Sequence, residues 1–222
     1  MMRGTPTEPS SLAEFADQVL RISTTRVREV ARLIVHAFEH SHTLWAAGNG
    51  GSASTASHFA SDLLTRLVKS AGPVPRVFSL VDSAPTLTAL TNDVGWENVY
   101  SLQLDRLLTT GDILVVFSVN GASAAFGPVR SSNLTHAVET GRAKGCTTVV
   151  VSGGGGGPLA ELADIALTTS RTEPWIVEPL HSLIAHLVIE DIAYLIDVGT
   201  SALAPALPPN NVVQPTAERR GC

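Results

Sequence analysis

The chain has 222 residues, a net charge of −5 and no strongly basic stretch. Nucleic acid is therefore a poor partner, because neutralising its phosphates requires clustered lysines and arginines. Hydrophobic residues make up 44% and charged residues 16% of the chain, which excludes disorder for most of it. This length suits one core better than two, so we expect a single domain over residues 1–222.

The two cysteines, Cys146 and Cys222, are not expected to form a structural disulfide. Cys146 opens an apolar run and is typical of a small core residue, while Cys222 is terminal. This usage fits a reducing cytosol. The N-terminal segment lacks the pattern of a signal peptide, and no uncharged apolar run reaches the ~18 residues of a membrane-spanning helix. We therefore expect a cytoplasmic protein without a membrane partner.

The predicted elements begin with two helices within residues 11–39, where apolar residues recur at helical spacing. From residue 43 onward, short apolar strands alternate with helices. We expect strands at 43–47, 75–80, 113–117, 147–151 and 165–168, and helices at 53–69, 86–92, 97–108, 134–144, 158–163 and 179–198.

Continuously apolar strands that alternate with helices indicate a parallel sheet covered on both faces. The predicted fold class is α/β: a three-layer αβα sandwich around a doubly wound, five-stranded parallel sheet, with extra N-terminal helices at 11–39. The core of this fold spans residues 43–198. The tail at 204–222 carries several prolines, and we expect it to be irregular.

A glycine loop, GNGGS at residues 48–52, joins the first predicted strand to a helix. Ligands of parallel sheets bind at the carboxyl ends of the strands. Glycines let backbone amides approach an anion, and the following helix offers the positive end of its dipole. The Ser52 hydroxyl can add a donor. The alternative is a tight turn without a ligand.

A second polar loop, SVNGAS at residues 118–123, follows the apolar strand ILVVF. Ser118, Asn120 and Ser123 place three short polar side chains at the same predicted edge of the sheet. Two such loops can together hold one phosphate with neutral donors, although each alone is equally consistent with a solvated turn. Five glycines at residues 153–157 form a third candidate that lacks side-chain donors.

The helix after GNGGS carries His58 and Asp62 four residues apart, so they share one face that Arg66 extends. Both can reach a common proton or metal ion. The simpler interpretation is an exposed stripe of ion pairs.

The last predicted helix carries His181 and His186 in an otherwise apolar run. Glu178 precedes Pro179, a residue suited to the first helical position, so we expect Glu178 to lie just outside the helix. If both are helical, Glu178 and His186 lie about 12 Å apart along the axis. They can then meet only through a second subunit.

The order of these motifs resembles the SIS (sugar isomerase) domain and, more narrowly, the phosphoheptose isomerases. GNGGS is followed by HFA and Asp62, by a turn with Asn92, Asp93 and Gly95, by S-x-x-G-x-S, and by a final helix with H-x4-H. The likeness covers about residues 27–197. It implies a flavodoxin-like fold, and a homotetramer with sites at subunit interfaces.

The resemblance also implies roles for individual residues. Asp62 and His186 occupy the positions of the family's acid/base pair, and some members bind Zn²⁺ at the positions of His58, Asp62, Glu178 and His186. The residues implied to contact the sugar phosphate are Asn49, Gly50, Gly51, Ser52, Arg66, Asn92, Asp93, Ser118, Asn120 and Ser123.

Three departures from the family pattern bear on the substrate. Asp62 stands where the family has Glu, Glu178 stands where it has Gln, and several residues are inserted around 125–132. The implied reaction interconverts sedoheptulose 7-phosphate and D-glycero-D-manno-heptose 7-phosphate through an enediol. The alternatives are an isomerase for another sugar phosphate in a specialised pathway, a non-catalytic SIS protein that binds a phosphosugar, and, ranked last, a plain nucleotide-binding α/β protein.

Overall fold

The computed structural model describes residues 9–68, 72–123 and 131–199. The predicted tail at 204–222, Cys222 and residues 125–130 of the inserted segment lie outside these ranges. Cys146 is buried and free.

A five-stranded sheet forms the centre of the fold, and all neighbouring strands run parallel. Its strands are β1 (Leu44–Gly48), β2 (Val77–Ser79), β3 (Ile113–Ser118), β4 (Thr147–Ser152) and β5 (Ile165–Thr168). The order β2-β1-β3-β4-β5 places the topological switch between β1 and β3. The predicted doubly wound α/β class is therefore confirmed, and the switch point is where such sheets bind ligands.

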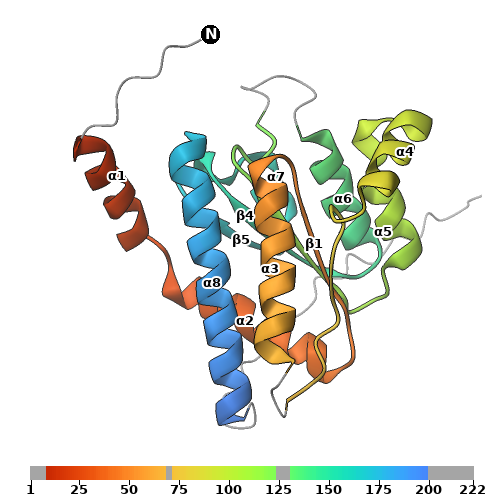
Figure 1. The fold of residues 1–222 in the computed structure, drawn as a ribbon, viewed down its shortest axis with the longest axis horizontal. Helices are drawn as coiled ribbons and strands as arrows, with labels where there is room; N and C mark the ends of the chain where they lie inside the picture. Colours follow the sequence, from red (N-terminus) through yellow and green to blue (C-terminus); the bar gives the residue numbers. More distant parts are fainter. Residues whose placement is uncertain (1–8, 69–71, 124–130, 200–222) are drawn as a thin grey trace, which may run out of the picture.

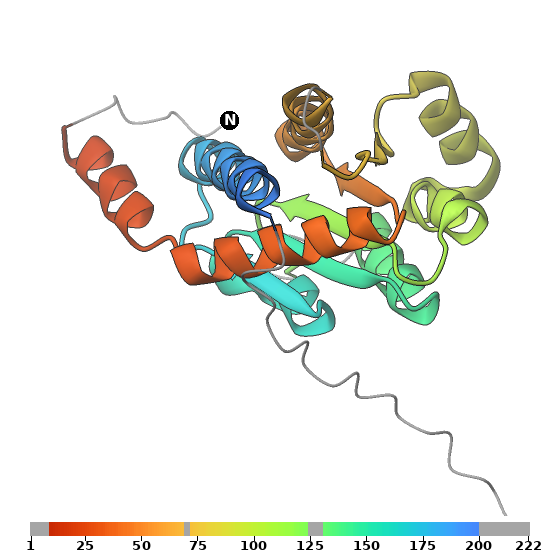
Figure 2. The ribbon, with the colours of Figure 1, turned by 90° about the horizontal axis from the view of Figure 1, so that it is seen from below.

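Helices cover both faces of this sheet. They are α1 (Pro9–Leu20), α2 (Thr24–Glu39), α3 (Gly51–Leu67), α4 (Ala84–Val94), α5 (Ser101–Leu107), α6 (Ser132–Ala143), α7 (Gly157–Leu162) and α8 (Pro174–Val198). One hydrophobic core lies under α2, α3 and α8, and a second lies under α5, α6 and α7 on the opposite face. Figures 1 and 2 show the three layers, with α3 and α8 side by side.

The amino edge of the sheet is organised by one buried carboxylate. Asp112, directly before β3, is 1% exposed. It accepts hydrogen bonds from the backbone N–H of Thr43 (2.8 Å), the indole of Trp45 (3.2 Å), and both the backbone N–H (3.0 Å) and the hydroxyl (3.1 Å) of Thr109. A buried charge with this many donors is well satisfied, so it holds β1 and β3 in register.

The last helix begins earlier than the sequence predicted. α8 begins at Pro174 and contains Pro179, so the expectation that Glu178 precedes the helix is wrong. Pro174 suits the first turn, where no N–H donor is required. Pro179 has no N–H to donate to the carbonyl of Trp175, so one helical hydrogen bond is missing. Burial of the helix on α2, α3 and the sheet outweighs this loss.

α8 is also the one helix, among those described, that is long and apolar enough to cross a membrane by length and composition. Half of its apolar window is buried inside the protein. A core helix of an α/β fold passes the same test, because both of its flanks pack on other elements.

Candidate active site

The loop after β1 forms a tight connection that brings α3 back onto the sheet. A Cβ on Gly48 would collide with the carbonyl of Ser52, and Gly50 has a φ of 56°, in the region that favours glycine. The next turn buries Ser52, which is 2% exposed. Its hydroxyl has no hydrogen-bond partner among the described residues. This orphaned donor lies in the first turn of α3, at the positive end of the helix dipole.

The loop after β3 lies beside the glycine loop, as the sequence predicted. Ser118 is 3% exposed, and the side chain of Asn120 accepts from the backbone N–H of Ala122 at 3.3 Å. A cavity of about 380 Å³ lies between the two loops, and its lining includes Asn49, Ser52, Trp96, Phe117, Ser118 and Asn120. We call Asn49, Ser52, Ser118 and Asn120 the loop cradle. Ser123, Gly50 and Gly51 do not line this cavity.

Two residues that the sequence reasoning missed hold the cradle in place. Asn49 and Asn133 exchange side-chain hydrogen bonds of 2.9 Å in both directions, and Asn133 is fully buried. The Tyr100 hydroxyl donates to the carbonyl of Gly48 at 2.6 Å. Burial raises the pKa of Tyr100 to about 12, so it stays a donor at neutral pH. Asn133 follows two serines before an apolar run, which signals a helix start; Tyr100 carries no sequence signal.

The five glycines after β4 serve packing rather than anion binding. The backbone N–H groups of Gly153, Gly154, Gly155 and Gly156 all donate to backbone carbonyls. A Cβ on Gly121 would collide with the carbonyl of Gly156, so this loop supports the loop after β3 through close backbone contact.

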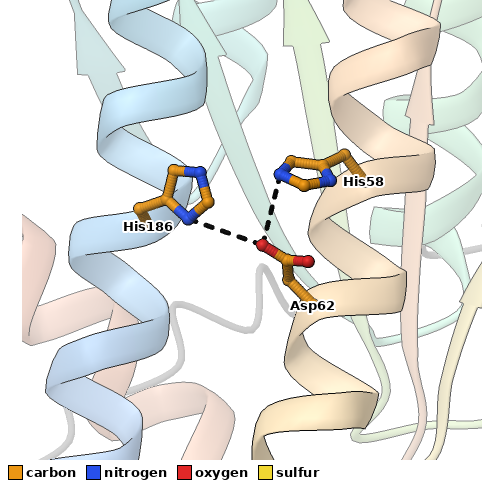
Figure 3. Close-up of side chains that lie close together, drawn as sticks. All are labelled: His58, Asp62 and His186. Carbon is orange, nitrogen blue, oxygen red and sulfur yellow. Dashed lines mark ion pairs between the residues drawn. The ribbon is translucent and has the colours of Figure 1, made fainter.

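A group of three titratable side chains lies between α3 and α8. His58 Nε2 and His186 Nδ1 lie 3.2 and 3.5 Å from the same oxygen of Asp62, Oδ2. Figure 3 shows the two imidazoles converging on this carboxylate from neighbouring helices. His58 and His186 are about half exposed and Asp62 about one-third, so the group faces outward. We call it the His–Asp–His group.

The His–Asp–His group has the composition of a metal-binding site. One donor atom from each residue lies within 4.8 Å of the others. Two imidazole nitrogens and a carboxylate oxygen are ligands that suit Zn²⁺. Glu178, the fourth predicted ligand, lies elsewhere: its carboxylate packs against Gly51, where any Cβ would collide with it. Because Glu178 and His186 are both helical, about 12 Å of axial rise separates them.

Three further predicted contact residues lie outside the described cavities. Arg66 pairs with Glu190 of α8 at 3.5 Å, and both side chains are exposed. Asn92 and Asp93 lie at the exposed end of α4, where the amide of Asn92 donates to Asp93 at 2.9 Å. Within one chain, therefore, Arg66, Asn92 and Asp93 do not border a cavity in which they could contact a substrate.

A larger cavity of about 850 Å³ runs along α3 between the loop cradle and the His–Asp–His group. Its lining includes Asn49, Ser54, Ser57, His58, Ser61, Asp82 and Trp96. Asn49 and Trp96 line the smaller cavity as well, so the two cavities adjoin.

His181 is the most buried histidine of the described chain. Its side chain is fully buried near Phe117, with ring centroids 6.1 Å apart, and neither ring nitrogen has a partner among the described residues. Burial lowers the pKa of His181 to about 4, so the ring is neutral at physiological pH.

Comparisons with known proteins agree with this geometry. The SIS domain family matches residues 10–153. The phosphoheptose isomerase of Nitratidesulfovibrio vulgaris is 31% identical over 195 residues, which cover 88% of this chain and 89% of that protein. The lincomycin biosynthesis protein LmbN of Streptomyces lincolnensis is 38% identical over 160 residues, 70% of this chain and 58% of that protein.

Among solved structures, a phosphoheptose isomerase from Francisella tularensis superposes with a TM-score of 0.73 at 25% identity, and the match covers 83% of this chain and 93% of that one. Almost the whole of that isomerase therefore shares the fold described above. The chain belongs to the SIS-domain family of phosphoheptose isomerases.

Proposed function

We propose that this chain, an enzyme of the phosphosugar isomerase class, interconverts sedoheptulose 7-phosphate and D-glycero-D-manno-heptose 7-phosphate. The observation that carries the proposal is the approach of His186 to Asp62, 3.5 Å apart on different helices, beside His58, which lines a cavity that adjoins the loop cradle. Family membership supports the reaction class.

The loop cradle would bind the phosphate. Ser52 offers a buried hydroxyl without a partner among the described residues, and Ser118 lies on the facing loop. The α3 dipole favours an anion at this end. Among the described residues, the lining of neither cavity includes a lysine or arginine, so the donors that these residues offer a phosphate are neutral.

Asp62 and His186 would carry the protons. An aldose–ketose isomerisation moves a proton between C1 and C2 through an enediol, and it requires a base near the carbons and an acid for the oxygens. With its Nδ1 facing Asp62, the imidazole of His186 keeps Nε2 free to exchange a proton with the substrate. The Asp62 carboxylate orients both histidines and is the second proton-transfer group.

His58, Asp62 and His186 would also hold a Zn²⁺ ion, which when bound would polarise the substrate carbonyl. Glu178 could join this set only from another chain or after its side chain leaves Gly51. Its carboxylate would make the set more negative than one with a neutral amide, which favours a cation.

A homotetramer with sites at subunit interfaces fits the outward faces of α3 and α8. These faces expose Leu64, Val68, Tyr194 and Val198, apolar side chains that a second copy would bury. We propose that residues 1–222 form one domain of such a cytoplasmic assembly.

The test is isomerisation of sedoheptulose 7-phosphate by wild type, His186→Ala and the control His136→Ala, a histidine of α6 outside both cavities. We expect His186→Ala to lose roughly 10²–10⁴-fold in kcat, the usual contribution of a general acid–base group, and to keep binding inorganic phosphate. Full activity of His186→Ala would refute the assignment.

A second candidate is isomerisation of a different sugar phosphate in a specialised pathway. The identity to the lincomycin biosynthesis protein, 38%, exceeds the 31% to the phosphoheptose isomerase. Glu178 in place of the family's Gln, and the inserted segment around 125–132, also favour a different substrate. Comparing kcat/KM for heptose, hexose and pentose phosphates decides between the two.

A further inference from the structure

The larger cavity lies between the two parts of the proposed site, and most of its wall belongs to neither the loop cradle nor the His–Asp–His group. Along α3 this wall carries Ser54, Ser57 and Ser61, spaced three and four residues apart on one face. His58 lines the cavity toward the His–Asp–His group, and Asn49 lines it toward the loop cradle.

The three serine hydroxyls are available to a ligand. None of them makes a hydrogen bond to any residue that the structure describes. Serine and threonine inside helices commonly turn their hydroxyl to a carbonyl of the preceding turn, as Thr55 does to Gly51 at 3.3 Å.

The charge of the larger cavity decides which end of a substrate enters it. Asp82 lines the cavity, is exposed, and has no ion-pair partner in the described part of the chain. A carboxylate repels a phosphate but accepts hydrogen bonds from hydroxyls. The phosphate is therefore directed to the loop cradle, where Ser52 is the unpartnered buried donor.

The spacing along α3 sets the length that the carbon chain of a substrate would span. Ser52 and His58 are six residues apart, about 9 Å of helical rise. The larger cavity is lined by Asn49 of the loop cradle, by the three serines and by His58, so it offers a path for a chain between a phosphate in the cradle and reacting carbons at the His–Asp–His group. Trp96, 40% exposed, borders both cavities and offers the apolar surface that ligand pockets combine with a few polar groups.

We propose that the larger cavity is the subsite for the open polyhydroxyl chain of the substrate. In it, Ser54, Ser57 and Ser61 hydrogen-bond hydroxyls of the chain, and Asp82 accepts from one of them. The proposal rests on the proposed function, since it presupposes a sugar phosphate, but it assigns residues that select the sugar rather than perform the reaction.

The test measures dissociation constants for three probes: sedoheptulose 7-phosphate, inorganic phosphate and heptyl phosphate, which has the chain length but no hydroxyls on its chain. Calorimetry is carried out in the His186→Ala background, so that the sugar is not converted. The variant Ser54→Ala, Ser57→Ala, Ser61→Ala should fold, because alanine favours helix more than serine does.

We expect this triple variant to bind the sugar phosphate at least about tenfold more weakly, since each neutral hydrogen bond contributes about two- to tenfold. Inorganic phosphate and heptyl phosphate should bind as before. The control Thr65→Ala, whose hydroxyl donates to the carbonyl of Asp62 at 3.2 Å outside the cavity lining, should change none of the three.

An unchanged dissociation constant for the sugar phosphate in the triple variant would overturn the subsite, and so would an equal loss for all three probes. The proposed function fails on a different result: wild-type protein that isomerises no heptose, hexose or pentose phosphate. The binding comparison keeps its meaning in that case, because it is made without turnover.

Discussion

The two edges of the sheet both bury polar side chains, but they leave them in different states. At the amino edge, the carboxylate of Asp112 accepts four hydrogen bonds. At the carboxyl edge, the equally buried hydroxyl of Ser52 and both ring nitrogens of His181 have no partner among the described residues. Unpartnered buried groups lower stability. The buried carboxylate at the amino edge thus adds stability, whereas at the carboxyl edge the Ser52 hydroxyl, which lines a cavity, is left available for a ligand.

The largest effect is expected from Asp62→Asn, on the outward side of α3 that faces α8. The amide cannot take up a proton, so we expect kcat to fall roughly 10²–10⁴-fold. The side chain is one-third exposed, and its ion-pair partners among the described residues are the two histidines, so the unfolding free energy should be unchanged. Steady-state kinetics and chemical denaturation measure the two quantities; a large loss of stability would show that Asp62 belongs with the structural carboxylates.

The corresponding substitution at the amino edge, Asp112→Asn, should lower the stability of the protein and leave its activity unchanged. An amide offers one acceptor oxygen where the carboxylate offers two, which leaves buried donors from Thr43, Trp45 or Thr109 unsatisfied. We expect the unfolding free energy to fall by about 2–5 kcal/mol, with kcat of the folded enzyme unchanged. Denaturant titration checks the first expectation, and activity at low temperature checks the second.

His181→Leu tests whether an unpartnered group at the carboxyl edge weakens the protein in acid. The pKa of His181 is about 4 when folded and about 6.5 when unfolded, so the unfolded chain takes up the proton first. Above about pH 6.5, protonation of His181 does not affect the unfolding free energy. As the pH falls toward 4, it lowers the unfolding free energy by about 3 kcal/mol in total.

Leucine cannot titrate, so the difference in unfolding free energy between wild type and His181→Leu should shift by that amount across this range. Other groups titrate alike in both proteins and cancel in the difference. A difference independent of pH would mean that His181 has a partner in the assembled protein.

The smallest effect is expected from Ser52→Ala. The change removes an unpartnered buried hydroxyl, so the unfolding free energy should rise by about 1 kcal/mol. It also removes a donor to a charged ligand, so the dissociation constant of inorganic phosphate should rise about tenfold or more. Thermal melting and calorimetry measure the two changes. Loss of stability without loss of phosphate affinity would place Ser52 with the structural residues of the amino edge.

The fold could be predicted because its signals are local and repeated. The runs at 113–117 and 147–151 are too apolar for any but doubly covered strands, and they form β3 and β4. The predicted start of α8 is wrong because both Pro174 and Pro179 suit the first turn of a helix. The packing that decides in favour of Pro174 is not visible in the sequence. β2, an edge strand of three residues, is shorter than the predicted strand at 75–80.

The candidate site could be predicted where side chains share a helix or a loop. His58 and Asp62 follow from their spacing, and the two polar loops follow from strand order. Asn133 and Tyr100 could not be found, because their contacts with Asn49 and Gly48 join segments 84 and 52 residues apart. Nor could the sequence show that the Glu178 carboxylate packs against Gly51 rather than beside His186.

One helix, α3, provides the buried hydroxyl of Ser52, the serine wall of the larger cavity, and both His58 and Asp62. The rise per residue of this helix therefore sets the distance between the site that binds the phosphate of a substrate and the site where its carbons react. Substitution of the α3 residues that line the larger cavity can change which sugar binds, while this distance stays constant. New substrate preferences can then evolve by point substitution without rebuilding the chemistry.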